Sequence, residues 1–104
     1  SDDVTLNDLM DALNKFLENR DKNKPLNTKI TSKEYSVSKR SNEIRSIIKL
    51  KKKVEFSELF DIISKEYLVV TFLSILDLTR KQEIDIKQES NFDKIYISEK
   101  VNNE

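Results

Sequence analysis

Residues 5–20 carry the first clear hydrophobic pattern, with apolar side chains recurring at every third or fourth position. This spacing places them on one face of an α-helix. Thr5, followed by Asp8 three positions later, matches a capping box and predicts that the helix begins there. Two interpretations stay open: the face packs on the chain's own domain, or it binds in a groove of another protein. The face consists of Leu6, Leu9, Met10, Leu13, Phe16 and Leu17.

A polar stretch at residues 21–33 lacks periodicity and contains the only proline, which indicates a linker. After it, Tyr35 and Val37 alternate with polar residues, which predicts a short strand. Ser38 is then expected to cap a helix over residues 39–51. The expected buried face of that helix is Ile44, Ile47, Ile48 and Leu50.

Short elements follow one another in the second half of the chain. Val54–Phe56 predicts a very short strand, and Ser57 is expected to cap a short helix. A longer helix is predicted at residues 66–81. Two alternating segments, residues 83–87 and 94–98, flank a polar turn and predict a β-hairpin. The apolar residues of the short helix are Leu59, Phe60, Ile62 and Ile63.

This order of elements predicts a mainly α (α+β) fold: a winged helix, which is a helix-turn-helix extended by a β-hairpin wing, preceded by an amphipathic helix. The expected division of the chain is an amphipathic helix at 1–20, a linker at 21–33, a winged-helix domain at 34–98 and a tail at 99–104. Few contacts should cross a polar linker, so we expect the winged domain to fold without the first helix.

The helix in the recognition position is poorly suited to DNA. Bases are read mostly by Arg, Lys, Asn and Gln, and phosphates are contacted by cations. Residues 66–79 contain none of these, and the hairpin at residues 82–98 has more acids than bases. Only Lys49 and Lys51–Lys53 are placed to touch phosphate, and lysines at a helix end are usually solvated. We therefore expect no sequence-specific DNA binding, and a protein as the partner.

The same helix carries more apolar surface than a small domain can cover, because helices that are apolar nearly all round are normally buried. One side is expected to face the core, and an adjacent stripe, spanning about 60° of arc, is expected to bind a partner. Two alternatives stay open: the hairpin and the amphipathic helix at 5–20 cover the surplus apolar surface, or Leu76 and Phe92 close the core. The expected core side is Leu68, Phe72, Ile75 and Thr79. The second stripe is Val69, Leu73, Leu76 and Arg80. The predicted partner-binding residues are Val69, Phe72, Leu73, Leu76 and Arg80, with Phe92 from the hairpin turn.

Cysteine, histidine and glycine are all missing from the sequence. Their absence removes thiolate metal ligands, the usual general base, and the loops that cradle phosphates. We therefore predict no catalytic residue, no metal and no cofactor, which makes an enzyme the least favoured class. The 19 basic and 19 acidic residues balance and give no overall attraction to nucleic acid or anionic lipid. No apolar run is long enough for a membrane span, and the lack of cysteine fits the cytoplasm.

A series of segments resembles the C-terminal region of the ScpA family, the kleisin subunits of bacterial SMC (structural maintenance of chromosomes) condensin complexes. The likeness covers nearly all of the chain and rests on the colinear series, since no single motif is diagnostic. One departure is Asp93-Lys94 after Phe92, where a glycine-containing pair is expected in many relatives. The segments are Asp8–Leu13 with Arg20, Val54–Phe60, Leu68–Leu78, Ile86–Gln88 and Asn91–Ile95.

The resemblance implies a non-catalytic subunit whose winged helix binds the cap face of one SMC ATPase head. The central kleisin region would bind a ScpB dimer, and the helix at 5–20 is a candidate for that contact. The closed ring entraps chromosomal DNA, so DNA contact would be indirect and the location cytoplasmic and nucleoid-associated. The chain opens without methionine and is expected to be a fragment of a longer protein. A winged-helix DNA-binding transcription regulator is the alternative function.

Overall fold

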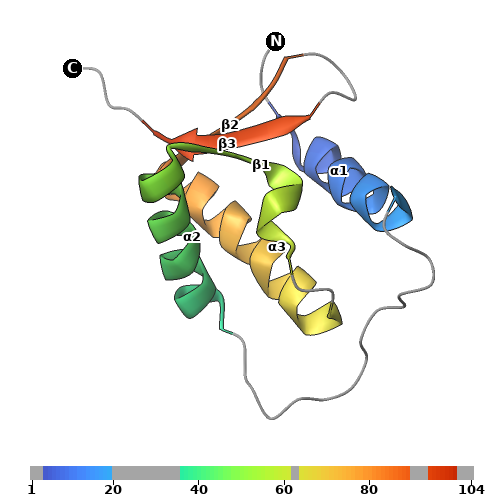
Figure 1. The fold of residues 1–104 in the computed structure, drawn as a ribbon, viewed down its shortest axis with the longest axis horizontal. Helices are drawn as coiled ribbons and strands as arrows, with labels where there is room; N and C mark the ends of the chain where they lie inside the picture. The colour runs from blue at the N-terminus through green and yellow to red at the C-terminus, as the bar shows by residue number, and fades with distance from the viewer. Residues whose placement is uncertain (1–3, 20–35, 62–63, 90–93, 101–104) are drawn as a thin grey trace.

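The computed structural model describes residues 4–19, 36–61, 64–89 and 94–100. In these residues the chain forms three α-helices, one short 3-10 helix and a three-stranded sheet. The sheet lies across one end of the helices, and α1 and α2 lie on opposite sides of α3 (Figure 1). In order, the elements are α1 (Leu6–Asn19), α2 (Val37–Lys51), β1 (Lys53–Glu55), the 3-10 helix η1 (Phe56–Leu59), α3 (Lys65–Arg80), β2 (Ile84–Gln88) and β3 (Ile95–Glu99).

The antiparallel sheet has β3 at its centre, between β1 and β2. Ile97 of β3 lies opposite both Val54 of β1 and Ile86 of β2. Val54 and Ile97 are almost fully buried, so this row faces the helices. The predicted hairpin is therefore present as β2 and β3, and β1 completes the sheet. The predicted fold class, a mainly α (α+β) winged helix preceded by an amphipathic helix, is confirmed.

Helix α2 begins earlier than the sequence suggested. The Ser36 hydroxyl caps it by accepting from the amide N–H of Lys39 at 3.0 Å, so Ser38 is not the cap and Val37 is helical, not in a strand. The extra first turn contributes the Val37 carbonyl, which accepts from the Ser74 hydroxyl of α3 at 3.1 Å. Leu50, expected on the buried face, is 83 % exposed because it lies away from the side that carries Ile44 and Ile48.

The turn after β1 also differs from its prediction. Glu55, not Ser57, caps η1: its carboxylate accepts from the Ser57 amide at 3.0 Å. The Glu58 carboxylate in turn accepts from the Glu55 amide at 2.7 Å, which completes a capping box around a single 3-10 turn. Phe56 consequently belongs to η1 and is buried there. The predicted linker 21–33, Tyr35, the pair 62–63 and the tail beyond residue 100 lie outside the described residues.

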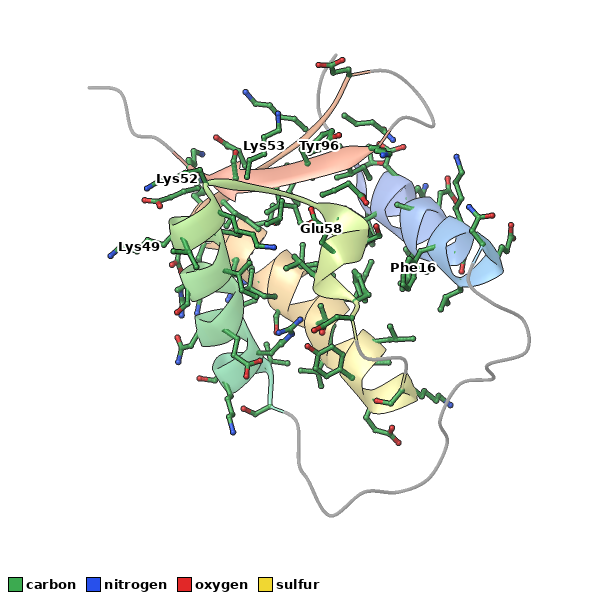
Figure 2. The ribbon with its side chains drawn as sticks, viewed as in Figure 1. Phe16, Lys49, Lys52, Lys53, Glu58 and Tyr96 are labelled. Carbon is green, nitrogen blue, oxygen red and sulfur yellow. The ribbon has the colours of Figure 1, made fainter. Side chains whose placement is uncertain are left out.

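Helix α1 begins as predicted, with a capping box. The Thr5 amide donates to Asp8 at 2.9 Å, and the Asp8 amide donates to the Thr5 hydroxyl at 3.1 Å. The helix packs on the rest of the domain through Leu9, which is 3 % exposed and belongs to the main hydrophobic core. Phe16 points from α1 toward η1, where its ring lies 6.1 Å from that of Phe60 (Figure 2).

A buried arginine joins α2 to its neighbours. Arg40 donates from Nε to the Thr71 hydroxyl of α3 at 3.0 Å and from Nη2 to the Leu59 carbonyl of η1 at 2.6 Å. Its guanidinium also lies 4.6 Å from the centre of the Tyr67 ring. The Tyr67 hydroxyl donates to Asp61 at 3.0 Å, and burial together with this bond raises the pKa of Tyr67. No local sequence pattern indicates this cluster, because its members lie up to 31 positions apart.

Candidate partner-binding surface

The core side of α3 is rotated relative to the predicted one. Thr79 was expected in the core but is exposed, and its hydroxyl donates back to the Ile75 carbonyl at 2.7 Å. The rotation follows from two small polar side chains, Thr71 and Ser74, that are completely buried against α2. The Thr71 hydroxyl accepts from the Arg40 guanidinium. The face of α3 that carries Thr71 therefore turns toward α2 and the core. The buried residues of α3 are Tyr67, Leu68, Thr71, Ser74, Ile75 and Leu78.

The predicted partner-binding stripe of α3 is only partly at the surface. Val69 and Leu73 are 50 % and 45 % exposed, whereas Leu76 is half-buried and packs against the core. Phe72 is also half-buried, with its ring edge-on to Phe56 at 6.5 Å between ring centres. Phe92 lies outside the described residues. The surface that α3 offers therefore centres on Val69 and Leu73.

Arg80, at the end of the stripe, is largely exposed but already has a partner. Its guanidinium donates to the Asp77 carboxylate at 2.9 Å, and Lys81 approaches the same carboxylate at 3.1 Å. The hydrogen bonds from these two cations hold the pKa of Asp77 below its usual value. A partner carboxylate would have to compete with Asp77 for Arg80.

An apolar groove of about 270 Å³ runs between α1 and α3. Its walls expose almost only carbon, with Lys65 as the single charged residue among those that line it. The sequence predicted an apolar stripe on each helix but not that the two stripes would face each other. The lining residues are Met10, Leu13 and Leu17 from α1 and Lys65, Leu68, Val69, Phe72 and Leu73 from α3.

The apolar face of α1 is divided between this groove and the core. Leu9 is buried, while Leu13, Phe16 and Leu17 are half-buried against the core. Leu6 and Met10 are 53 % and 46 % exposed. The helix therefore packs on its own domain with part of its face and presents the rest to solvent, so the two interpretations of this face are compatible.

The opposite end of the molecule is charged. Lys49, Lys52 and Lys53 are exposed around the corner between α2 and β1, and Lys53 lies 4.6 Å from the centre of the Tyr96 ring (Figure 2). Beside them, Arg45 donates to both carboxylate oxygens of Glu83, at 2.7 and 2.8 Å. The bond from Arg45 lowers the pKa of Glu83 and raises that of Arg45.

Two kinds of feature, a metal-binding group and a membrane-spanning helix, are not seen in the part of the chain that the structure describes. That part holds no group of histidine, cysteine or acidic side chains arranged to bind a metal. It also holds no helix whose length and apolar content would carry it across a membrane.

The amino-acid sequence of the chain is similar to those of known proteins. The family profile of segregation and condensation protein ScpA matches residues 2–100 of the chain. The chain belongs to the ScpA family. Its curated ScpA relatives include that of Listeria welshimeri, 39 % identical over 100 residues, which are 94 % of this chain and 40 % of the relative. The ScpA of Bacillus velezensis is 41 % identical over 96 residues, or 91 % of this chain and 38 % of the relative.

The match to the ScpA family is confined to part of each relative. The ScpA of Bacillus cereus is 39 % identical over 97 residues, which are 92 % of this chain and 39 % of that protein. The chain thus spans about two fifths of the length of these ScpA proteins. The matched region includes α1 and the whole winged helix, and therefore both walls of the groove.

Proposed function

We propose that this chain is a non-catalytic kleisin subunit that binds the cap face of an SMC ATPase head through α3. In this role it helps close the SMC–ScpA–ScpB ring for chromosome condensation and segregation. Membership of the ScpA family supports the proposal. The observation that carries it is the pair Val69 and Leu73, two large apolar side chains exposed on the helix that a DNA-binding winged helix would use to read bases.

The exposed pair has the chemistry of a protein interface. Single exposed apolar residues are common, but a contiguous apolar patch usually marks a binding surface. Val69 and Leu73 lie one helical turn apart, and Met10 of α1 lines the same groove. Burying such side chains against a partner gains about 25 cal/mol for each Å² of apolar surface removed from water.

The charges of the domain argue against the alternative, a DNA-binding transcription regulator. The two cations of α3, Lys65 and Arg80, are its first and last residues, and Arg80 is bonded to Asp77. Lys65 corrects the expectation of a helix that begins at residue 66, but it adds only one cation at the end. The exposed lysines near β1 fit weak, salt-sensitive contact with phosphate and carry no base-reading geometry. We therefore propose that DNA is reached only indirectly, through the complex.

A ScpB dimer is the second proposed partner. Leu6 is half-exposed at the start of α1 and does not line the groove, so it is the residue of the α1 face that we assign to such a contact. Because both proposed partners belong to a chromosome-organising complex, we propose that the chain acts at the nucleoid in the cytoplasm. The same role calls for no catalytic group.

Isothermal titration calorimetry of the chain against an isolated SMC head, without DNA or nucleotide, tests the proposal. We expect saturable heat with a dissociation constant in the micromolar range or tighter, and loss of that heat for Leu73→Glu, because the buried acid would lack a partner. Leu50→Glu is the matched control, since Leu50 is exposed on α2, far from the groove. No heat at high micromolar concentration, with both proteins folded, would overturn the proposal.

A further inference from the structure

The groove between α1 and α3 is open and lies at the small end of the size range of small-molecule pockets. Its volume is about 270 Å³, below the roughly 300–1,000 Å³ that is usual for such sites. Its length suits side chains of a protein instead. Met10 and Leu17 lie seven positions apart on α1, which corresponds to about 10 Å or two turns along the helix axis.

The walls determine the conformation of an occupant. Both are α-helices, whose backbone groups are bonded within the helix, so the groove has no strand edge to pair with. An extended peptide lying there would leave its own N–H and C=O groups without partners wherever water is excluded. A helix satisfies its own backbone and presents apolar side chains three and four positions apart. The groove therefore suits a helix of about two turns.

Lys65, the one charged residue among those that line the groove, indicates which charge the bound helix should carry beside it. Lys65 lines one end and forms no ion pair with any of the described residues. A carboxylate at the corresponding end of the occupant would complement it. Opposite charges at the rim of an interface mainly fix its orientation and accelerate association.

We infer that α1 is the second wall of the SMC-head site, and that the groove receives a two-turn amphipathic helix of the head whose apolar row ends in a carboxylate near Lys65. The inference rests on the proposed function and extends the site from α3 to α1. Met10, Leu13 and Leu17 thus contact the partner together with Val69 and Leu73. Because α1 must remain docked to form the groove, occupation of the groove also holds α1 in place.

Two variants of α1 test this inference in calorimetry against the head. Met10→Glu should weaken binding at least tenfold, because it places a charge inside the groove. Asn14→Glu should stay within about twofold of the unaltered chain, since Asn14 is also exposed on the same helix but does not line the groove. Lys65→Glu should weaken binding several-fold, more at low salt, without loss of stability, because an acid suits the first turn of a helix.

The outcomes separate this inference from the proposed function. If the unaltered chain does not bind the head, the proposed function fails and the inference falls with it. If Leu73→Glu abolishes binding while Met10→Glu binds normally, α3 is the interface and α1 is not a wall of it. If Lys65→Glu binds the head as tightly as the unaltered chain, the predicted carboxylate near Lys65 is wrong. Self-association that Met10→Glu abolishes would assign the groove to a second copy of this chain.

A spectroscopic probe covers the case in which Met10→Glu impairs folding. The chain has no cysteine, so Met10→Cys accepts a single thiol-reactive, environment-sensitive fluorophore. Its emission should shift to shorter wavelength when the head binds, whereas the same probe at Asn14→Cys, exposed on α1 outside the groove, should not change. Equal shifts at both positions, or none at Met10→Cys with the head bound, would contradict the inference.

Discussion

Helices α1 and α2 lie on opposite sides of α3, and the domain holds them by different means (Figure 1). Hydrogen bonds hold α2 against α3. Arg40 donates to the Thr71 hydroxyl, and the Ser74 hydroxyl donates to the Val37 carbonyl at 3.1 Å. On the other side, α1 has one buried residue, Leu9, and a ring contact with η1. The groove opens on this second side.

The contrast between these two contacts of α3 explains why the groove exists. Small polar residues let α2 approach α3 closely, and their bonds fix the rotation of α3 about its axis. That rotation turns one apolar stripe of α3 into the core and leaves Val69 and Leu73 outside. Helix α1 makes its main contact with η1 and the core, so it stands beside the second stripe without covering it.

Breaking the α2 side should have the largest effect. Arg40→Ala removes the donor for the buried Leu59 carbonyl and the Thr71 hydroxyl. Each such loss costs about 1–3 kcal/mol, so we expect the free energy of unfolding to fall by about 3–5 kcal/mol in urea titration. Arg40→Lys keeps the charge but not the forked geometry and should be intermediate. A loss below about 1 kcal/mol would show that apolar contacts, not this arginine, hold α2.

Removing the α1 side should have a smaller effect. A chain of residues 30–104 loses Leu9 and Phe16, and should unfold cooperatively with stability lower by about 2–3 kcal/mol. Thermal melting followed by near-UV circular dichroism measures this. The winged domain keeps its own core and its polar bonds in such a chain, which is why we expect it to fold. A molten species with a broad transition would instead make α1 an integral part of the core.

Breaking the Arg45–Glu83 ion pair on the α2 side with acid should produce the smallest effect. Arg45 of α2 lowers the pKa of Glu83, just before β2, from its ordinary 4.5. The stability that this pair contributes is complete above that value and is lost as pH falls through the lowered pKa. Unfolding midpoints measured from pH 6 to pH 2 should show a smaller decline for Glu83→Gln than for the unaltered chain. Identical pH profiles would indicate that the exposed pair contributes nothing.

Local patterns predicted most of the elements. The stripe of α1, its Thr5–Asp8 cap, α3 and the hairpin all depend on residues a few positions apart, and these were found at or near their predicted bounds. The start of α2 was missed because two serines two positions apart both suit a cap. Sequence alone could not choose Ser36, since the first turn that Ser36 begins is joined to α3 by a long-range bond, from the Ser74 hydroxyl to the Val37 carbonyl.

Long-range contacts limited the prediction of the site. The rotation of α3 depends on Arg40 meeting Thr71 across 31 positions, and no local pattern indicates that an arginine is buried. The predicted core therefore included the exposed Thr79 and missed Leu78. Val69 and Leu73 were predicted correctly as exposed, because the helix has more apolar residues than its neighbours can cover. That α1 would complete a groove with them depends on packing, which periodicity does not specify.

The attachment points of α2 also determine how the domain carries mechanical load. Helix α2 forms hydrogen bonds with neighbouring elements through Val37, Arg40 and Arg45. These three positions span about 12 Å along the helix axis. The first two reach α3, and the third reaches the chain just before β2. We therefore expect a force on the outer face of α3 to be transmitted to α2 through Val37 and Arg40. From α2 it would reach the sheet through Arg45 and Glu83. Among the described residues, α1 is held by apolar contacts through Leu9 and Phe16, so under load we expect it to separate from the domain before α2 does.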